Sequence, residues 1–258
     1  MSGKVILVTK SKTYAEKHFC SLLAAGFEIV YFPTIQIKPQ LDSEELRRGL
    51  ENFNEFDWII FTSTNAVEVF YEIAVRKNIK LKKIKIACVG SETAERCRQK
   101  NIRVNLVPYE FSAAGLVKEF AKVNLIDKKV FIPCSGLSRS ELKLELAELG
   151  ADVTSVPIYD AVVNDEINLI SEIEIINKKK PDVFVFTSPS SFNNYLVLMN
   201  IESPAKYFEH NVVCSIGSTT EAAITANNVY VSIVPESFSL SGVKEAIKKY
   251  FSIEKNIA

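Results

Sequence analysis

The sequence lacks the residue patterns on which most catalytic sites depend. It contains only two histidines, His18 and His210, and neither belongs to a metal-ligand spacing. Because no histidine lies near a polar cluster, a Ser-His-Asp triad is not expected. A GxxxxGK[ST] loop and a GxGxxG turn are also missing, which argues against a P-loop nucleotidase and a dinucleotide-dependent enzyme.

Paired cysteines, net charge and long apolar runs are missing as well. The five cysteines form no CxxC pair and are odd in number, so no disulfide framework is expected and a cytoplasmic location is predicted. The 31 basic residues balance 31 acidic residues, which argues against a nucleic-acid partner. No apolar run approaches the length of a membrane span and no signal peptide is evident, so no membrane partner is expected.

An internal repeat is the strongest feature that the sequence does have. Three motifs return after 125 to 127 residues: FTS at Phe61–Ser63 and Phe186–Ser188, VGSETAE at Val89–Glu95 and IGSTTEA at Ile216–Ala222, VPYEFSAAGL at Val107–Leu116 and VPESFSLSGV at Val234–Val243. Gly26 and Pro33 match Gly150 and Pro157 at an offset of 124. A register held over most of the chain predicts two similar lobes, each near the common domain size, with a ligand between them.

Short apolar runs alternate with helical patterns along both repeats. The predicted strands are Lys4–Val8, Glu28–Phe32, Trp58–Phe61, Lys85–Val89, Arg103–Val107, Lys129–Ile132, Asp152–Val156, Val183–Phe186, Val212–Ser215 and Val229–Val234. The clearest helix is Ser138–Leu149, with Gly150 as its stop. This alternation predicts an α/β fold of two similar doubly wound lobes, each with a parallel sheet of five strands.

Two stretches interrupt the rhythm at matching places, Pro33–Asn54 and Pro157–Pro181. In one arrangement each repeat forms its own domain. In the other, these stretches are crossovers, and the first two strands of one repeat join the last three of the other. The sequence alone supports both arrangements.

Small polar clusters follow the predicted strands, at the sheet edge where α/β proteins bind ligands. They are TSTN (Thr62–Asn65), GSET (Gly90–Thr93), TSPSS (Thr187–Ser191), GSTT (Gly217–Thr220), FSAAG (Phe111–Gly115), FSLSG (Phe238–Gly242) and PCSGLSR (Pro133–Arg139). Each would leave N–H groups and hydroxyls at a helix start, which binds anions. The alternative is that these serines and threonines are ordinary N-caps. The pairing of six clusters by the repeat favours a shared anionic ligand.

Two further residues are candidates for a chemical role. Tyr159 lies in the second linker, where a phenol could donate a proton to a leaving hydroxyl, or could be packed at a hinge. Lys10 lies at the turn after the first strand, where it could bind an anion or belong to a solvated face.

The chain resembles the uroporphyrinogen-III synthase family over nearly its whole length. The resemblance lies in FTSTNAVEVF (Phe61–Phe70), VGSETAE, IPCSGLSRSEL (Ile132–Leu142), LGADVTSVPIY (Leu149–Tyr159), FTSPSSFNNY (Phe186–Tyr195), SIGSTTEAA (Ser215–Ala223) and VPESFSLSGV. It implies a HemD-like fold of two lobes joined by a two-strand linker, with the active site in the cleft. This is the crossover arrangement, with residues 1–37 and 168–258 in one lobe and 38–167 in the other.

The implied activity is that of a cyclising hydro-lyase in heme biosynthesis. It would convert hydroxymethylbilane, a linear polycarboxylate tetrapyrrole, to uroporphyrinogen III with inversion of ring D and loss of water. The enzyme would act by holding a flexible substrate so that ring closure takes the inverting route. The resemblance implies no metal and no cofactor, a monomer, and a transient partner in hydroxymethylbilane synthase.

The resemblance also assigns roles to single residues. Tyr159 would be the acid that assists departure of the hydroxyl. Substrate contacts are expected from Lys10, Thr62, Ser63, Ser91, Ser188, Ser190, Ser218, Thr219 and Thr220. Many family members have arginine where Lys10 stands, so the bidentate fork is lost and the charge is kept. Because the repeat counterpart of Tyr159 is Ile35, the chemistry is expected in one copy only.

The alternative function, from another class, is a cytosolic two-lobe module that binds a small anion for sensing. Both functions would use the same polar clusters. They differ in turnover, since a sensor would release its ligand unchanged.

Overall fold

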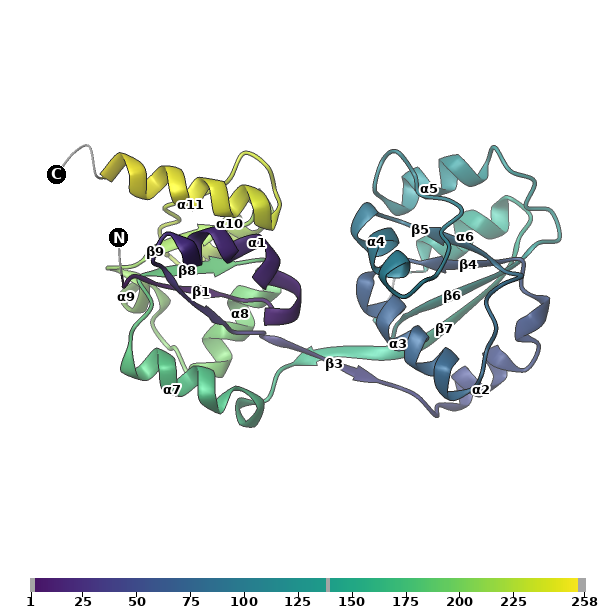
Figure 1. Cartoon of the computed structure of the whole chain (residues 1–258), viewed down its shortest axis with the longest axis horizontal. Coiled ribbons are helices and arrows are strands. Elements are labelled where there is room, and N and C mark those ends of the chain that lie inside the picture. The colour runs from purple at the N-terminus through teal and green to yellow at the C-terminus, as the bar shows by residue number, and fades with distance from the viewer. Residues whose placement is uncertain (1–2, 138–139, 255–258) are drawn as a thin grey trace. The chain divides into compact units, whose positions relative to one another are not determined.

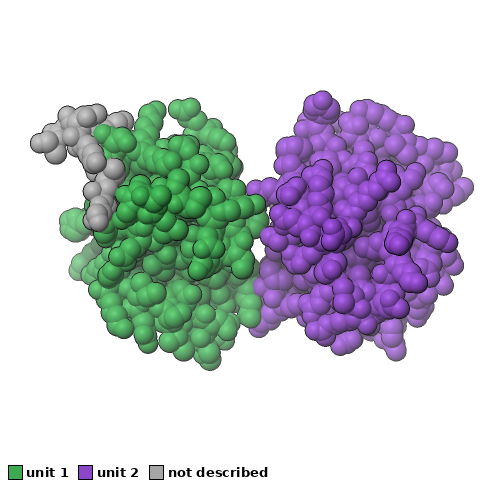
Figure 2. Space-filling model, viewed as in Figure 1, with its two compact units in different colours: residues 1–36, 163–258 green, residues 37–162 purple. Residues whose placement is uncertain are grey.

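The computed structural model describes residues 3–137 and 140–254, which form two compact units (Figure 2). Unit 1 consists of residues 1–36 and 163–258, and unit 2 of residues 37–162. The first and second boundaries fall one and five residues before those expected from the sequence, and they lie within strand β3 and at the end of strand β7.

Unit 1 is built on a parallel sheet of four strands in the order β2-β1-β8-β9 (Figure 1). The strands are β1 (Val5–Val8), β2 (Glu28–Tyr31), β8 (Val183–Phe186) and β9 (Val212–Ser215). The helices are α1 (Lys12–Ala24), η2 (Glu166–Leu169), α7 (Ile170–Lys178), α8 (Pro189–Leu198), α9 (Pro204–Phe208), α10 (Ser218–Thr225) and α11 (Leu240–Glu254). Separate apolar cores fill the two faces of the sheet, as its continuous apolar strands require.

Unit 2 has a sheet of five strands in the order β3-β7-β6-β4-β5. The strands are β3 (Ile35–Pro39), β4 (Trp58–Phe61), β5 (Lys85–Cys88), β6 (Lys129–Ser135) and β7 (Asp152–Val163). The helices are α2 (Glu44–Leu50), η1 (Phe53–Glu55), α3 (Thr64–Arg76), α4 (Ser91–Gln99), α5 (Ala113–Phe120) and α6 (Glu141–Glu148). Strands β4 to β7 are parallel, and apolar cores cover both faces.

Strand β3 runs antiparallel to β7, and this pair carries the chain from one unit into the other. The Gln40 N–H donates to the Ile158 carbonyl at 2.8 Å, and the Asn164 N–H donates to the Thr34 carbonyl at 3.0 Å. Residue numbers therefore rise along one strand as they fall along the other, which defines an antiparallel pair.

The sheets exchange strands between the two repeats. Strands β1 and β2 of the first repeat lie beside β8 and β9 of the second, whereas β4 and β5 of the first lie beside β6 and β7 of the second. The predicted α/β fold class is confirmed, and the crossover arrangement is the one adopted. The matching linkers after β2 and in β7 are the segments at which the chain changes units.

The predicted fifth strand of each repeat is wrong. Arg103–Val107 and Val229–Val234 each make a single bridge to the neighbouring strand. In both segments a side chain replaces a ladder bond, because Asn105 Oδ1 at 2.9 Å and Ser232 Oγ at 3.4 Å accept backbone N–H groups of β5 and β9. The same departure in both copies shows that the repeat preserves this irregular edge.

Glycines end the equivalent helices α1 and α6. Gly26 and Gly150 adopt φ values of 88° and 89°, a left-handed conformation that glycine accepts without strain. The prediction that Gly150 ends the helix before it is therefore confirmed. The predicted start of that helix at Ser138, and the neighbouring Arg139, lie outside the described residues.

Candidate functional site

Each parallel sheet has a carboxyl edge, defined here as the edge at which its parallel strands end. The chain leaves two adjacent strands in opposite directions, β1 and β8 in unit 1 and β4 and β6 in unit 2. Such a switch point is the usual ligand site of an open α/β sheet. The sequence-predicted polar residues fall into two groups, one at the carboxyl edge of each unit.

In unit 2, the edge brings Tyr159 together with Ser63. The Tyr159 hydroxyl lies 3.0 Å from Ser63 Oγ, and Ser63 is the N-cap of α3, accepting the Ala66 N–H at 3.1 Å. The Gly136 N–H donates to the Tyr159 carbonyl at 3.0 Å, which fixes the backbone of β7 against the end of β6. Two residues predicted for the site from distant parts of the sequence are thus in direct contact.

The Tyr159 phenol stays protonated at neutral pH. Its side chain is 6 % exposed, and this burial raises its pKa above the usual 10.0, while hydrogen bonds to Ser63 and Ser135 act in the opposite direction. Ser63 Oγ accepts from the Ala66 N–H and still has its own hydrogen to donate to the phenol oxygen. With Ser63 as the donor in this pair, the phenol can give its own hydrogen to another acceptor.

Two backbone donors lie beside this hydroxyl pair. The Thr62 and Ser63 N–H groups donate no hydrogen bond to any acceptor in residues 3–137 and 140–254. Both residues are half-buried and directly precede the first turn of α3, where the helix dipole favours a negative charge. The arrangement can hold a carboxylate next to a neutral phenol.

In unit 1, the equivalent edge uses its donors internally. The Thr187 N–H donates to Thr9 Oγ1 at 3.2 Å and to Ser191 Oγ at 3.1 Å, and the Ser188 N–H donates to Ser191 Oγ at 3.0 Å. Ser188 in turn caps α8 by accepting the Ser191 N–H, and its hydroxyl lies 3.0 Å from Ser190 Oγ. Thr9 was not predicted, and Ser191 was predicted only as a member of the TSPSS cluster. Ser188 and Ser191 form a capping box, in which serine takes the place of the usual Glu or Gln.

The ordinary N-cap interpretation is confirmed for four of the polar clusters. Their serines accept N–H groups three residues further on, and they are Ser63, Ser112, Ser188 and Ser239. Helices α4 and α10 differ, because they begin after glycines, which have no side chain for capping. Their first turns remain candidates for binding an anion.

The predicted residues on those two helices are unequally placed. Ser91, Ser218 and Thr219 are exposed in the first turns of α4 and α10. Thr220 is 3 % exposed, so its side chain lies in the protein interior, as does that of Thr93 in the other copy. Lys10 is exposed after β1, with its ammonium 5.1 Å from the centre of the Tyr14 ring.

The sequence reasoning missed two exposed aromatic rings at the carboxyl edges. Phe111 and Phe238 occupy equivalent positions and are 62 % and 64 % exposed. The Phe238 ring covers the glycine N-cap of α10, since a Cβ built on Gly217 would lie 3.0 Å from the ring. The only sequence signal for these rings is the phenylalanine that opens the repeated FSxxG motif. An isolated phenylalanine of this kind is normally interpreted as a core residue.

The described residues show neither a metal centre nor a membrane helix. Within residues 3–137 and 140–254, no three His, Cys, Asp or Glu side chains are grouped so that they could hold a metal ion. No helix in these ranges has both the length and the apolarity to cross a bilayer.

The fold and its edges define a class of α/β protein, in which two crossed repeats each present polar helix starts at a carboxyl edge. Comparison with known proteins then identifies the family. The family described as Uroporphyrinogen-III synthase HemD matches residues 14–244, so the chain belongs to the uroporphyrinogen-III synthase family, cyclising lyases of porphyrin biosynthesis. This membership favours the cyclase over the sensor module.

Curated relatives match along nearly the whole chain. A putative uroporphyrinogen-III synthase of Methanocaldococcus jannaschii is 28 % identical over 247 residues, covering 94 % of this chain and 97 % of the relative. The uroporphyrinogen-III synthase of Synechococcus elongatus is 26 % identical over 254 residues, covering 96 % of each.

Solved structures support the fold. The uroporphyrinogen-III synthetase of Helicobacter pylori is similar with a TM-score of 0.63 at 18 % identity, covering 97 % of this chain and 99 % of that one. A mutant uroporphyrinogen III synthase of Thermus thermophilus gives a TM-score of 0.59 at 15 % identity, with the same coverage.

Proposed function

We propose that this protein converts hydroxymethylbilane to uroporphyrinogen III, closing the macrocycle with inversion of ring D and release of one water. The observation that carries the proposal is the carboxyl edge of unit 2. There a protonated phenol, Tyr159, is held by Ser63 beside the available N–H groups of Thr62 and Ser63. The substrate offers the matching groups, a leaving hydroxyl and several carboxylates.

In the proposed step, Tyr159 assists departure of the hydroxyl. A substrate carboxylate accepts the N–H groups of Thr62 and Ser63, which places the hydroxymethyl group near the phenol. The phenol hydrogen moves onto the departing oxygen as the C–O bond breaks, and water leaves. The electrophilic carbon then bonds to the substituted α-carbon of ring D, which gives a spiro-pyrrolenine. The older bridge bond at that carbon breaks, and the freed bridge carbon bonds to the unsubstituted α-carbon of ring D. The proton that this carbon loses on rearomatisation restores the phenol. General-acid assistance of this kind contributes about 10²–10⁴-fold.

We propose that the remaining carboxylates are bound by small polar groups of both units. The candidates are Lys10, Ser91, Ser188, Ser190, Ser218, Thr219 and Thr220, where Thr220 would act from its buried position by supporting the first turn of α10. The exposed rings of Phe111 and Phe238 offer flat apolar surfaces for pyrrole rings. Holding the chain of pyrroles at several points favours the inverting closure by orientation.

The product isomer tests the proposal. Purified protein is mixed with freshly generated hydroxymethylbilane, and the products are oxidised and separated by chromatography. The expected product is the type III isomer, whereas a reaction without protein gives the type I isomer. Type I product alone in the presence of folded protein would refute the proposal.

We further propose that the protein acts as a monomer in the cytoplasm and receives its unstable substrate from hydroxymethylbilane synthase in a transient encounter. Sedimentation velocity should give a single species at the mass of one chain, 28.9 kDa. A stable dimer, or a long-lived complex with the synthase, would contradict this part of the proposal.

A further inference from the structure

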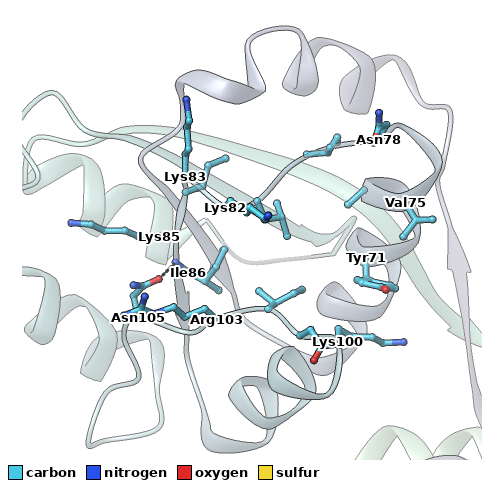
Figure 3. A pocket seen from close by; sticks show the side chains of 16 residues that line it. Tyr71, Val75, Asn78, Lys82, Lys83, Lys85, Ile86, Lys100, Arg103 and Asn105 are labelled. Atoms are coloured by element: carbon cyan, nitrogen blue, oxygen red, sulfur yellow. Dashed lines mark hydrogen bonds between the residues drawn. The ribbon is translucent and has the colours of Figure 1, made fainter.

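A basic pocket lies at the opposite edge of unit 2, where strand β5 begins (Figure 3). Its volume is about 690 Å³, within the range of small-molecule sites. Five cationic residues line it, and no carboxylate does: Lys82, Lys83, Lys85, Lys100 and Arg103. Such an excess is unusual in a chain whose net charge is zero.

Two of the five cations already interact with other side chains of the protein. Lys100 pairs with Glu68 at 2.8 Å, and Lys85 lies 5.3 Å from the centre of the Trp58 ring. For Lys82, Lys83 and Arg103, no ion pair is formed with any residue in the described part of the chain. Three cations at the pocket thus have no ion-pair partner among residues 3–137 and 140–254.

Helix dipoles explain only part of the remaining charge. Helices α3 and α4 both end at this pocket, and each C-terminus carries about half a negative charge. Together they offset about one cation. Lys100 is set aside with its partner Glu68, and Lys85 with Asp57, whose pKa its charge helps to lower. Three cations remain, so the pocket keeps an excess of about two positive charges.

The pocket also has neutral donors and an apolar floor. Asn105 uses its side-chain oxygen to accept the Ile86 N–H at 2.9 Å, which leaves its NH₂ group as a donor. Ile79, Ile86 and Ile102 form apolar parts of the lining. A site rich in donors and without carboxylates suits a ligand with several anionic groups.

The same place in unit 1 shows that the fold does not require these cations. There the segment between α8 and β9 forms α9, and Tyr207 and Phe208 pack their rings against Phe184. The pocket that remains is about 420 Å³ and contains Glu202 beside Lys180 and Lys206. In unit 1, aromatic packing is therefore enough to cover this sheet edge. The lysines at the equivalent edge of unit 2 are not needed for the fold.

The basic pocket is separate from the proposed reaction site. Helix α3 has 13 residues and extends from Ser63 at the carboxyl edge to the pocket, a length of about 20 Å. Because α3 and α4 reach both places, an occupant would contact the far ends of the helices that carry Ser63 and Ser91 at their starts.

We propose that this pocket binds a small polyanion with two or more phosphate or carboxylate groups, at a site distinct from that of the reaction. Lys82, Lys83 and Arg103 would contact the anionic groups, and the isoleucines would contact an apolar part where the ligand has one.

Calorimetric titration of the whole protein with inorganic triphosphate and, separately, with citrate tests the proposal. At least one of them should bind with one ligand per chain, and the tighter of the two identifies the anionic group. The double substitution Lys82→Gln with Lys83→Gln should weaken binding by about tenfold or more. Type III isomer formation without added ligand should be unchanged, since these lysines lie outside the reaction site.

The matched control is Lys180→Gln with Lys206→Gln, which removes the same charge from the equivalent edge of unit 1. Unchanged binding in this control supports a specific site. Equal weakening by both double variants would show nonspecific attraction, and absence of binding by both probes at low salt would also overturn the proposal. Circular dichroism confirms that each variant is folded.

Discussion

The carboxyl edges of the two units are built from equivalent positions, and two of these positions decide how the backbone donors are used. Where unit 1 has Thr9 and Ser191, the repeat places Pro133 and Ala66 in unit 2. The two hydroxyls of unit 1 accept the N–H groups that follow β8. Proline and alanine have no such acceptor, so the corresponding N–H groups of unit 2 remain available to a ligand.

The comparison shows how a duplicated edge can become specialised without a change of fold. In unit 1 the polar groups satisfy one another and hold β1 and β8 together. In unit 2 the capping serine, Ser63, is hydrogen-bonded to Tyr159, whose counterpart in the other repeat is Ile35. One copy of the edge thus carries a stabilising network, and the other carries the proposed acid and anion donors.

Removing the phenol should have the largest effect. Tyr159→Phe keeps the buried ring and deletes the hydroxyl, so we expect kcat to fall about 100-fold with the fold intact. Steady-state assays of type III isomer formation measure this. Tyr109→Phe, at an exposed position in the same unit, is the control. Equal rates in the two variants would remove Tyr159 from the mechanism.

Breaking the unit 1 network should reduce stability more than activity. Ser191→Ala gives unit 1 the residue of unit 2 and leaves the Thr187 and Ser188 N–H groups without this acceptor. We expect the free energy of unfolding to fall by about 1–3 kcal/mol, measured by urea denaturation. Ser190→Ala, on the exposed side of the same turn, should change it by about 0.5 kcal/mol or less. Similar losses in both would contradict the network.

The converse substitution should block the donors of unit 2. In Ala66→Ser the new hydroxyl is placed to accept the Thr62 and Ser63 N–H groups, as Ser191 does in unit 1. We expect KM to rise about tenfold with a smaller change in kcat, because one charge-assisted contact to the substrate is lost. Ala113→Ser, at an exposed helix start, should leave KM unchanged. An unchanged KM for Ala66→Ser would argue against carboxylate binding at these donors.

A buried hydroxyl in unit 1 offers a smaller test. Ser215 Oγ is fully buried and has no hydrogen-bond partner among the described residues, whereas its counterpart in unit 2 is Cys88. Because an unsatisfied buried hydroxyl is unfavourable, Ser215→Ala should raise the free energy of unfolding by about 1 kcal/mol. Ser215→Cys, which copies unit 2, should act in the same direction. A loss of stability in both would show that the hydroxyl has a partner.

The smallest signal is the titration of one tyrosine. Tyrosinate absorbance is followed against pH in the unsubstituted protein and in Tyr159→Phe, and the difference isolates Tyr159. Since burial raises its pKa, this difference should develop above pH 10.0. The neutral phenol is then favoured by folding, so its contribution to stability is present below pH 10.0 and is lost as pH rises through the raised pKa. A midpoint below 10.0 would contradict the burial.

Features set by local sequence were predictable here. The repeat and the alternation of apolar runs predicted two α/β sheets, and Gly150 predicted a helix end. The fifth strands failed because Arg103–Val107 and Val229–Val234 are as apolar as true strands. Their pairing is limited by the side chains of Asn105 and Ser232, which no apolar pattern reveals.

The chemistry of the candidate site depends on contacts between distant residues. Thr9 and Ser191 are 182 residues apart, and Ser63 and Tyr159 are 96 apart. Their meeting follows from the order of the strands, which local propensity does not encode. The exposure of the Phe111 ring could not be predicted either. The sequence shows that the residue is apolar, and apolar residues are usually buried.

The exchange of strands between repeats also affects synthesis on the ribosome. Strands β1 and β2 emerge first, yet their partner β8 begins at Val183, 152 residues after β2 ends at Tyr31. At translation rates of about 5–20 residues per second, roughly 8–30 s pass before synthesis reaches β8, the first strand that can join β1 from the second repeat. Unit 2 is a continuous segment and can fold within that interval. During this interval the apolar strands β1 and β2 lack their partner β8 and are exposed to aggregation, although unit 2 can already be folded.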